Sequence, residues 1–210
     1  MSEFFDVRLF TEVFVTLFVI MDPPGTVPVF LGLTSAMGAK QRKQAARTAI
    51  LVAGGVIGAG GGVGGLGVRD MHISLPALQT AGGLLLLLVA MELLTGKMEE
   101  PQPSGNKGVN VALVPLGTPL LAGPGAIVAT MVFVQRAGER GGGVAEWVAI
   151  AAGVVAVHVC LWLSMRFANV INRVLGDSGT ILVTRIAGLL LAAIAVQLVA
   201  DAVIEFVQTA

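Results

Sequence analysis

An acidic residue, two prolines and a glycine stand together in the middle of the first long apolar stretch of the chain. The run reads Asp22, Pro23, Pro24, Gly25, Thr26. Proline has no backbone N–H and disfavours helical backbone at the residue before it, so this run should break a helix. The helix that restarts near Thr26 would present free N–H groups to an anion, while Asp22 could bind a cation or a proton. The structural alternative is a kinked helix in which Asp22 only caps the second part.

The same Pro-Gly dipeptide recurs in a later apolar stretch. Pro124-Gly125 follows Gly123 there and repeats Pro24-Gly25 without the acidic residue. Two breaks that meet inside one protein could bind a small polar solute between them, whereas two plain kinks would be structural only. The residues expected to contact a solute are Asp22, Pro24, Gly25, Thr26, Thr118, Gly123, Pro124 and Gly125.

The elements that position these residues are predicted to be helices that cross a lipid bilayer. Of the 210 residues, 55% are hydrophobic and 12% are charged, whereas soluble domains carry about 25% charged residues. A helix needs about 20 mainly apolar residues to span the hydrocarbon core. Six stretches meet this length, at residues 10–37, 48–68, 77–95, 111–135, 147–165 and 181–206. The predicted fold class is an all-α polytopic membrane protein with six transmembrane helices, of which helices 1 and 4 are broken.

The distribution of charge predicts an orientation and excludes nucleic acid as a partner. Thirteen Lys and Arg residues balance thirteen Asp and Glu residues, so no net field would attract a polyanion. With six spans, nine basic residues fall on one side of the membrane: Lys40, Arg42, Lys43, Arg47, Lys97, Lys107, Arg166, Arg173 and Arg185. The other four are Arg8, Arg69, Arg136 and Arg140. Cytoplasmic loops are the richer in Lys and Arg, so both termini are predicted to lie outside the cytoplasm.

An internal similarity indicates that the chain is built from two halves. The segments 80–93 and 185–198 align, with Gly83 matching Gly188. The two Pro-Gly breaks match in the same way.

Each half is predicted to contain three spans. Residues 1–95 form the first repeat, residues 96–110 a cytoplasmic linker and residues 111–210 the second repeat, within one membrane domain. Because three is an odd number, the second repeat starts on the opposite side of the membrane, which is the inverted arrangement of many secondary transporters. The two breaks would then face each other across a central cavity near the membrane midplane.

A few other polar residues lie within the predicted spans. Glu92, Arg185 and Gln197 are candidates, with Asp22, for ion coupling or proton relay. The alternatives are that Glu92 reaches the membrane interface, that Arg185 anchors its helix there and that Gln197 bonds between helices. His158 could relay protons or serve only in packing.

The remaining motifs support no enzyme, metal or cofactor. Gly60, Gly62 and Gly65 have the spacing of a nucleotide-binding loop, but no strand precedes them, and close helix packing is the better account. No Ser, His and acid motif, and no cluster of metal ligands, occurs at a recognisable spacing. Cys160 has no second cysteine to pair with.

Four blocks of sequence resemble the MarC family of bacterial inner-membrane proteins. They are FVTLFVIMDPPGTVPVFLGLT at 14–34, ISLPALQTAGGLLLLLVAMELL at 73–94, VPLGTPLLAGPGAI at 114–127 and LGDSGTILVTRIAGLLLAAIAVQL at 175–198. The resemblance implies six spans, location in the bacterial inner membrane and, for some members, transport of small neutral amino acids such as glycine and alanine. The second span, with nine glycines between Thr48 and Val68, is unusually rich in glycine for this family.

Together these features predict a secondary transporter of small neutral amino acids. A zwitterionic solute suits the predicted site, because helix N-termini would bind its carboxylate and Asp22 its ammonium group. A proton or a sodium ion could couple to transport. The alternatives are a non-transporting membrane scaffold or stress-response protein, and a channel or exporter for another small solute. Oligomeric state and direction of transport stay open.

Overall fold

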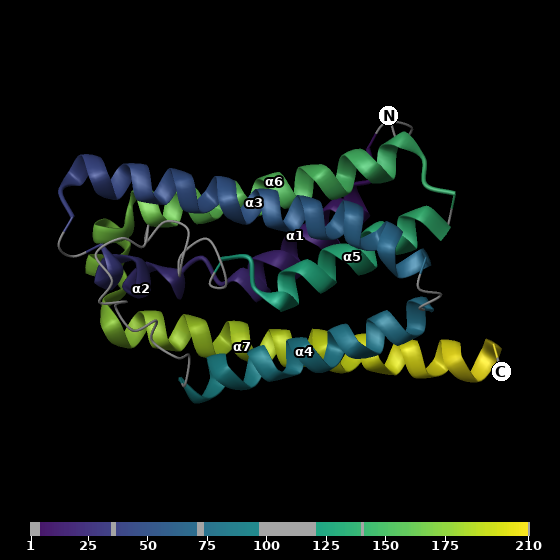
Figure 1. Cartoon of the computed structure of the whole chain (residues 1–210). Coiled ribbons are helices and arrows are strands. Elements are labelled where there is room, and N and C mark those ends of the chain that lie inside the picture. Colours follow the sequence, from purple (N-terminus) through teal and green to yellow (C-terminus); the bar gives the residue numbers. More distant parts are fainter. Residues whose placement is uncertain (1–4, 35–36, 71–73, 97–120, 140, 210) are drawn as a thin grey trace.

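The computed structural model describes residues 5–34, 37–70, 74–96, 121–139 and 141–209, and these residues fold into helices (Figure 1). The helices are α1 (Val7–Met21), α2 (Thr26–Leu33), α3 (Ala39–Asp70), α4 (Leu75–Thr95), α5 (Pro124–Glu139), α6 (Val144–Arg166) and α7 (Ala168–Thr209).

The first of these helices breaks where the sequence predicts it. The Asp22 N–H donates to Phe18 O (3.0 Å) and closes the last turn of α1. Asp22 itself has φ 38° and ψ 70°, the left-handed conformation that ends a helix and that Asp tolerates better than most residues. Pro23 and Pro24 follow, and α2 starts at Thr26 with its axis bent by 48° from that of α1. The break is therefore a property of the local sequence.

Several helices are long and apolar enough to cross a bilayer. Within the described residues they are Ala39–Gly62, Pro76–Thr95, Val144–Arg166 and Ser178–Gln208. The bent pair of α1 and α2 makes a fifth if the two helices form one span. The protein is thus an all-helical membrane protein with four or five candidate spans.

The predicted boundaries differ most from these helices at the starts of the second and sixth spans. The predicted sixth span starts at residue 181, but α7 already starts at Ala168, so Arg173 belongs to the helix and not to a connector. The predicted second span starts at residue 48, but α3 already starts at Ala39, so Lys40 and Arg47 belong to the helix and not to a connector. Lys, Gln, Arg and Ala are good helix formers, which explains why the helix continues beyond its apolar part. In the predicted stretch 111–135, only α5 and the residues just before it lie within the described ranges.

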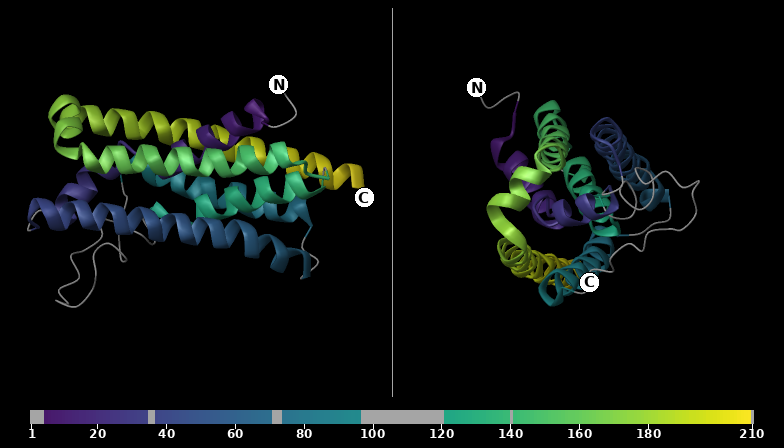
Figure 2. Two further views of the ribbon diagram at one scale, coloured as in Figure 1. Left: turned by 90° about the horizontal axis from the view of Figure 1, so that it is seen from above. Right: turned by 90° about the vertical axis from the view of Figure 1, so that its left-hand side faces the viewer.

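The helices form three layers. Seen end-on, α1, α2 and α5 lie between the pair α3 and α6 on one side and the pair α4 and α7 on the other (Figure 2). Figure 1 shows the same layers from the side, with the start of α1 and the end of α7 at the same end of the bundle. The joined α1 and α2, α4 and α6 run away from that end, and α3, α5 and α7 run back toward it.

Glycines allow close approach between the middle layer and the α3–α6 layer. A Cβ placed on Gly61 of α3 would come within 2.6 Å of the Thr130 side chain on α5. A Cβ on Gly153 of α6 would come within 2.7 Å of the Val13 side chain on α1. Lipid gives helices no hydrophobic reason to associate, so small residues that bring backbones together supply much of the attraction.

The contact between α4 and α7 is also made by glycines, one on each helix. A Cβ on Gly83 would lie 2.9 Å from Ala195 O, and a Cβ on Gly188 would lie 3.2 Å from Ala90 O. Each glycine therefore faces the backbone of the opposite helix at the turn that carries an alanine.

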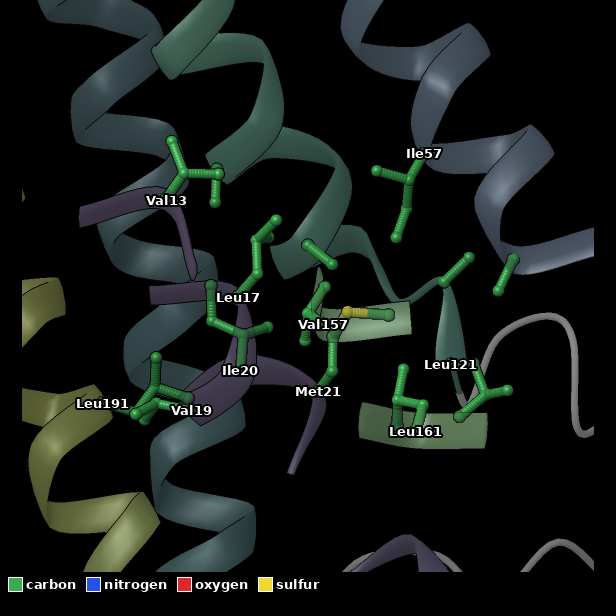
Figure 3. Packing of buried hydrophobic residues seen from close by; sticks show 14 of the residues in the cluster. Val13, Leu17, Val19, Ile20, Met21, Ile57, Leu121, Val157, Leu161 and Leu191 are labelled. Atoms are coloured by element: carbon green, nitrogen blue, oxygen red, sulfur yellow. The ribbon is translucent and has the colours of Figure 1, made fainter. Parts of the chain in front are cut away.

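A buried apolar cluster surrounds the break. The side chains of α1 meet those of α3, α6 and α7 in this cluster (Figure 3). Its labelled members in Figure 3 are Val13, Leu17, Val19, Ile20, Met21, Ile57, Leu121, Val157, Leu161 and Leu191. Met21 directly precedes Asp22, and Leu121 precedes Pro124-Gly125, so the break and the second Pro-Gly segment lie in the same packed region.

Candidate solute site at the broken span

Asp22 lies inside the bundle, with 4% of its surface exposed. Its Oδ1 accepts a hydrogen bond from the Gly25 N–H (3.2 Å). Its Oδ2 is equally buried and has no hydrogen-bond partner of ordinary geometry among the described residues. A buried, unpaired carboxylate oxygen is costly in a membrane protein, because lipid cannot replace the lost water. One oxygen of Asp22 therefore bonds the turn just before α2, and the other is left without a partner of ordinary geometry.

The first N–H groups of α2 are not free, contrary to the prediction from sequence. Besides the bond to Asp22 Oδ1, the Thr26 N–H donates to Asp22 O (3.0 Å) and the Val27 N–H donates to Pro24 O (3.2 Å). The Thr26 hydroxyl is also used within the turn, where it donates to Pro23 O (2.8 Å). The tight turn folds the chain back onto its own donors, so the start of α2 offers an anion few free groups.

Gly25 and a residue of α7 complete the surroundings of the free carboxylate oxygen. A Cβ on Gly25 would overlap Asp22 Oδ2 and come within 2.8 Å of Thr184 Oγ1. The Thr184 hydroxyl approaches the Asp22 side chain, but Oδ2 makes no bond that meets both distance and angle criteria. Thr184, which is half-buried, thus borders the same small space from the other half of the chain.

The segment predicted to form the second break lies beside the first break. The helix α5 starts at Pro124, and Gly123 O accepts the N–H groups of Ala126 (3.1 Å) and Ile127 (3.2 Å). A Cβ on Gly125 would lie 3.5 Å from the Ile20 side chain, two residues before Asp22.

The other face of this contact is apolar. The same Cβ on Gly125 would lie 2.9 Å from Leu86 of α4. Thr118, which the sequence predicts as a site residue, lies outside the described residues.

The three predicted relay residues do not join Asp22 in the interior. Glu92 of α4 and Arg185 and Gln197 of α7 are all exposed. The Gln197 side chain donates to Asp201 Oδ1 (2.7 Å) on its own helix, so the predicted bond between helices is replaced by one along α7. Glu92 and Gln197 lie two positions beyond the alanines that face the opposite helix, and successive residues turn by about 100° on a helix, which directs them outward.

His158 is buried between α6 and α3, with 7% of its surface exposed. Its Nδ1 lies 2.7 Å from Val154 O, so the ring donates from Nδ1 to this carbonyl. Its Nε2 has no partner in the described part of the chain and faces Gly54 of α3, on which a Cβ would lie 3.5 Å away. His158 thus packs against α3 with an Nε2 that has no partner among the described residues, in a layer next to the one that contains Asp22.

Reasoning from sequence missed Thr184, although a signal was present. Extending the alignment of 80–93 with 185–198 by one residue toward the N-terminus pairs Gln79 with Thr184. Gln79 is almost fully buried, with 1% of its surface exposed. Each of the two aligned positions carries a polar residue at the edge of an apolar segment. This pattern indicates that both side chains point into the interior of the protein.

The fold and the site define an integral membrane protein of apolar helices with a polar break inside one of them. A profile described as "MarC family integral membrane protein" matches residues 7–207. The chain belongs to this family, which confirms the resemblance seen in the four sequence blocks.

Relatives from archaea and bacteria match along nearly their whole length. The chain is 32% identical over 203 residues to a UPF0056 membrane protein of Methanocaldococcus jannaschii, covering 94% of this chain and 97% of that protein. It is 31% identical over 204 residues to the UPF0056 membrane protein YhcE of Escherichia coli, covering 94% and 93%. It is 29% identical over 208 residues to the UPF0056 inner membrane protein MarC of Salmonella typhimurium, covering 93% and 94%. No solved structure matches the chain. These names describe membrane proteins and name no substrate.

Proposed function

We propose that this chain is a secondary transporter that carries small neutral amino acids, such as glycine and alanine, across the inner membrane. The observation that carries the proposal is the free Oδ2 of Asp22, buried at the break of a span. An ionisable residue within a membrane helix costs about 2.5 to 3.5 kcal/mol on insertion scales. A neutral Asn or Ser would bond the turn before α2 as well as Asp22 does, so the charge needs another reason to be present.

The two charges of a zwitterion have different places in this proposal. Asp22 Oδ2 binds the ammonium group. The carboxylate is bound near the positive dipole end of α5, which lies beside the first break. As at Thr26 and Val27 of α2, the N–H groups of Ala126 and Ile127 in α5 are bonded within the chain, so the dipole and not a free N–H group attracts the carboxylate.

An inverted repeat of three and three helices is part of the proposal. The alignment that places Gly83 on Gly188 also places Ala90 on Ala195. Gly83 approaches Ala195 and Gly188 approaches Ala90, so exchanging the halves exchanges one contact for the other. The two Pro-Gly dipeptides align α5 with α2, and the contact of α5 with α3 has its counterpart in the contact of α2 with α6. Reciprocal contacts of this kind are what a two-fold axis in the membrane plane would produce.

The proposed repeat also predicts a membrane topology. Six spans, a cytoplasmic linker at 96–110 and both termini outside the cytoplasm agree with the start of α1 and the end of α7 lying at one end of the bundle. A carrier of this kind binds and releases its solute unchanged, so the proposal includes no enzyme activity. Coupling to a proton or a sodium ion would act through Asp22.

Uptake into proteoliposomes tests the proposal. Purified protein is reconstituted, and uptake of labelled glycine, alanine and a larger amino acid is measured with and without imposed proton and sodium gradients. A carrier predicts saturable uptake of glycine or alanine that an excess of unlabelled solute inhibits. Uptake that does not saturate would indicate a channel, and no uptake of any amino acid would favour a scaffold.

A further inference from the structure

The space beside Gly25 is bordered by two oxygen atoms from distant parts of the chain. Asp22 Oδ2 comes from the break in the first span and Thr184 Oγ1 from α7. Both oxygens flank the point where a side chain at position 25 would begin, so only glycine lets them come this close. The carboxylate oxygen is buried, and although the Thr184 hydroxyl approaches the carboxyl group, Oδ2 has no hydrogen bond of ordinary geometry among the described residues.

Asp22 has no cationic partner among the described residues, since it forms no ion pair with any of them. Arg185 follows Thr184 in sequence but is exposed, because adjacent residues point in different directions on a helix. A hydroxyl can accept a hydrogen bond or coordinate a cation while it sits beside a carboxylate. Two oxygens that lie close together with no cationic side chain paired to them can bind one positively charged group.

We infer that Thr184 is the second half's contribution to the Asp22 site, and that its hydroxyl and Asp22 Oδ2 together bind a single monovalent cationic group. This inference rests on the proposed function for the identity of that group, which is the ammonium of the amino acid or the coupling ion, sodium or a proton. Asp22 belongs to the first half and Thr184 to the second. Occupancy would therefore join the broken span to α7, and an empty site would leave the two elements joined by apolar contacts alone.

A binding measurement on the full-length protein tests the inference separately from transport. Binding of glycine, and of sodium chloride against choline chloride, is measured by calorimetry on the purified chain in nanodiscs. Proton uptake or release is recorded from the dependence of the heat on buffer ionisation. The variants are Thr184→Val, which keeps the shape without the hydroxyl, and Thr184→Ser, which keeps the hydroxyl. The matched control is Thr180→Val, one turn earlier on α7, where the hydroxyl donates to Gly176 O of the same helix (3.0 Å).

Thr184→Val should weaken binding of the ligand by about ten- to a hundredfold, which is the usual effect of losing a hydrogen bond to a charged group. Thr184→Ser should restore most of the affinity, and Thr180→Val should bind like the parent. In a protein that already carries Asp22→Asn, adding Thr184→Val should cause little further loss of affinity, because both residues would bind the same group.

The outcomes separate the inference from the proposed function. If the parent binds glycine and Thr184→Val binds it equally well, with sodium and proton responses unchanged, the inference is overturned while the proposed function stands. If the parent binds sodium but no amino acid and Thr184→Val weakens sodium binding, the site stands and the proposed substrate falls. A loss of affinity that is the same in Thr184→Val and Thr180→Val, or that adds fully to Asp22→Asn, would also overturn the inference. A parent that binds neither glycine, sodium nor a proton would do the same.

Discussion

Gly83 of α4 and Gly188 of α7 have reciprocal positions in one helix crossing. Each lies against the backbone of the opposite helix, Gly83 near Ala195 and Gly188 near Ala90. The two contacts involve the same aligned residues with the halves exchanged. A single crossing thus shows the reciprocal contacts that the proposed inverted repeat predicts.

Enlarging either glycine should destabilise the protein by a similar amount. Gly83→Val and Gly188→Val each place a branched side chain against backbone atoms that cannot move aside, and overpacking of this kind costs about 1 to 3 kcal/mol. The apparent melting temperature of each purified variant is the measurement. Gly62→Ala on α3 is the control, because a Cβ there meets nothing within 4 Å. Stability equal to that of the control for both glycine variants would refute the close crossing.

Filling the space beside Gly25 should abolish solute binding while leaving the helices in place. In Gly25→Ala the new methyl group would compete with Asp22 Oδ2 for the same position. We expect glycine uptake to fall at least about tenfold, because the carboxylate must rotate away from the site. Gly32→Ala on α2 is the matched control, since its Cβ would meet nothing within 4 Å. Parent-like uptake in Gly25→Ala would mean that the solute binds elsewhere.

The predicted orientation can be tested by labelling from outside the cell. Single cysteines are placed at Phe4→Cys and Lys43→Cys after Cys160 has been replaced by Ser. A membrane-impermeant maleimide should label position 4 in intact cells and position 43 only after permeabilisation, because Lys40 to Arg47 form part of the basic side of the membrane. The reverse pattern would invert the topology and place both termini in the cytoplasm.

The parts of the fold that depend on local sequence could be predicted directly, whereas those that depend on helix rotation leave only indirect signals in the sequence. The break at Asp22 follows from Pro23 and Pro24, whose effect on the backbone is independent of the rest of the protein. The contact between Asp22 and Thr184 joins residues far apart in the chain. It depends on which face α7 turns inward, and a single threonine in an apolar helix does not specify that face.

The placement of the relay candidates also depends on which face of each helix turns inward. Glu92 and Gln197 are candidates for ion coupling from their polarity, with the membrane interface as the alternative for Glu92 and a bond between helices as that for Gln197, and both side chains are exposed. Their positions relative to Ala90 and Ala195 could have predicted this, since small residues mark the packed face of a membrane helix. The anion site expected at α2 was wrong because the prediction counted the helix start but not the turn before it, in which Thr26 and Val27 already donate to the chain.

Counterflow of glycine in proteoliposomes, compared between the parent, Asp22→Asn and Asp201→Asn, tests the central claim most directly. Asp22→Asn keeps the size of the side chain and removes its charge, while Asp201→Asn makes the same chemical change at a carboxylate that accepts from Gln197 away from the break. The account predicts that the parent and Asp201→Asn exchange labelled glycine at similar rates and that Asp22→Asn, folded and inserted to the same extent, loses at least about tenfold. Equal counterflow in the parent and Asp22→Asn would contradict it and reduce Asp22 to a residue that bonds the turn before α2.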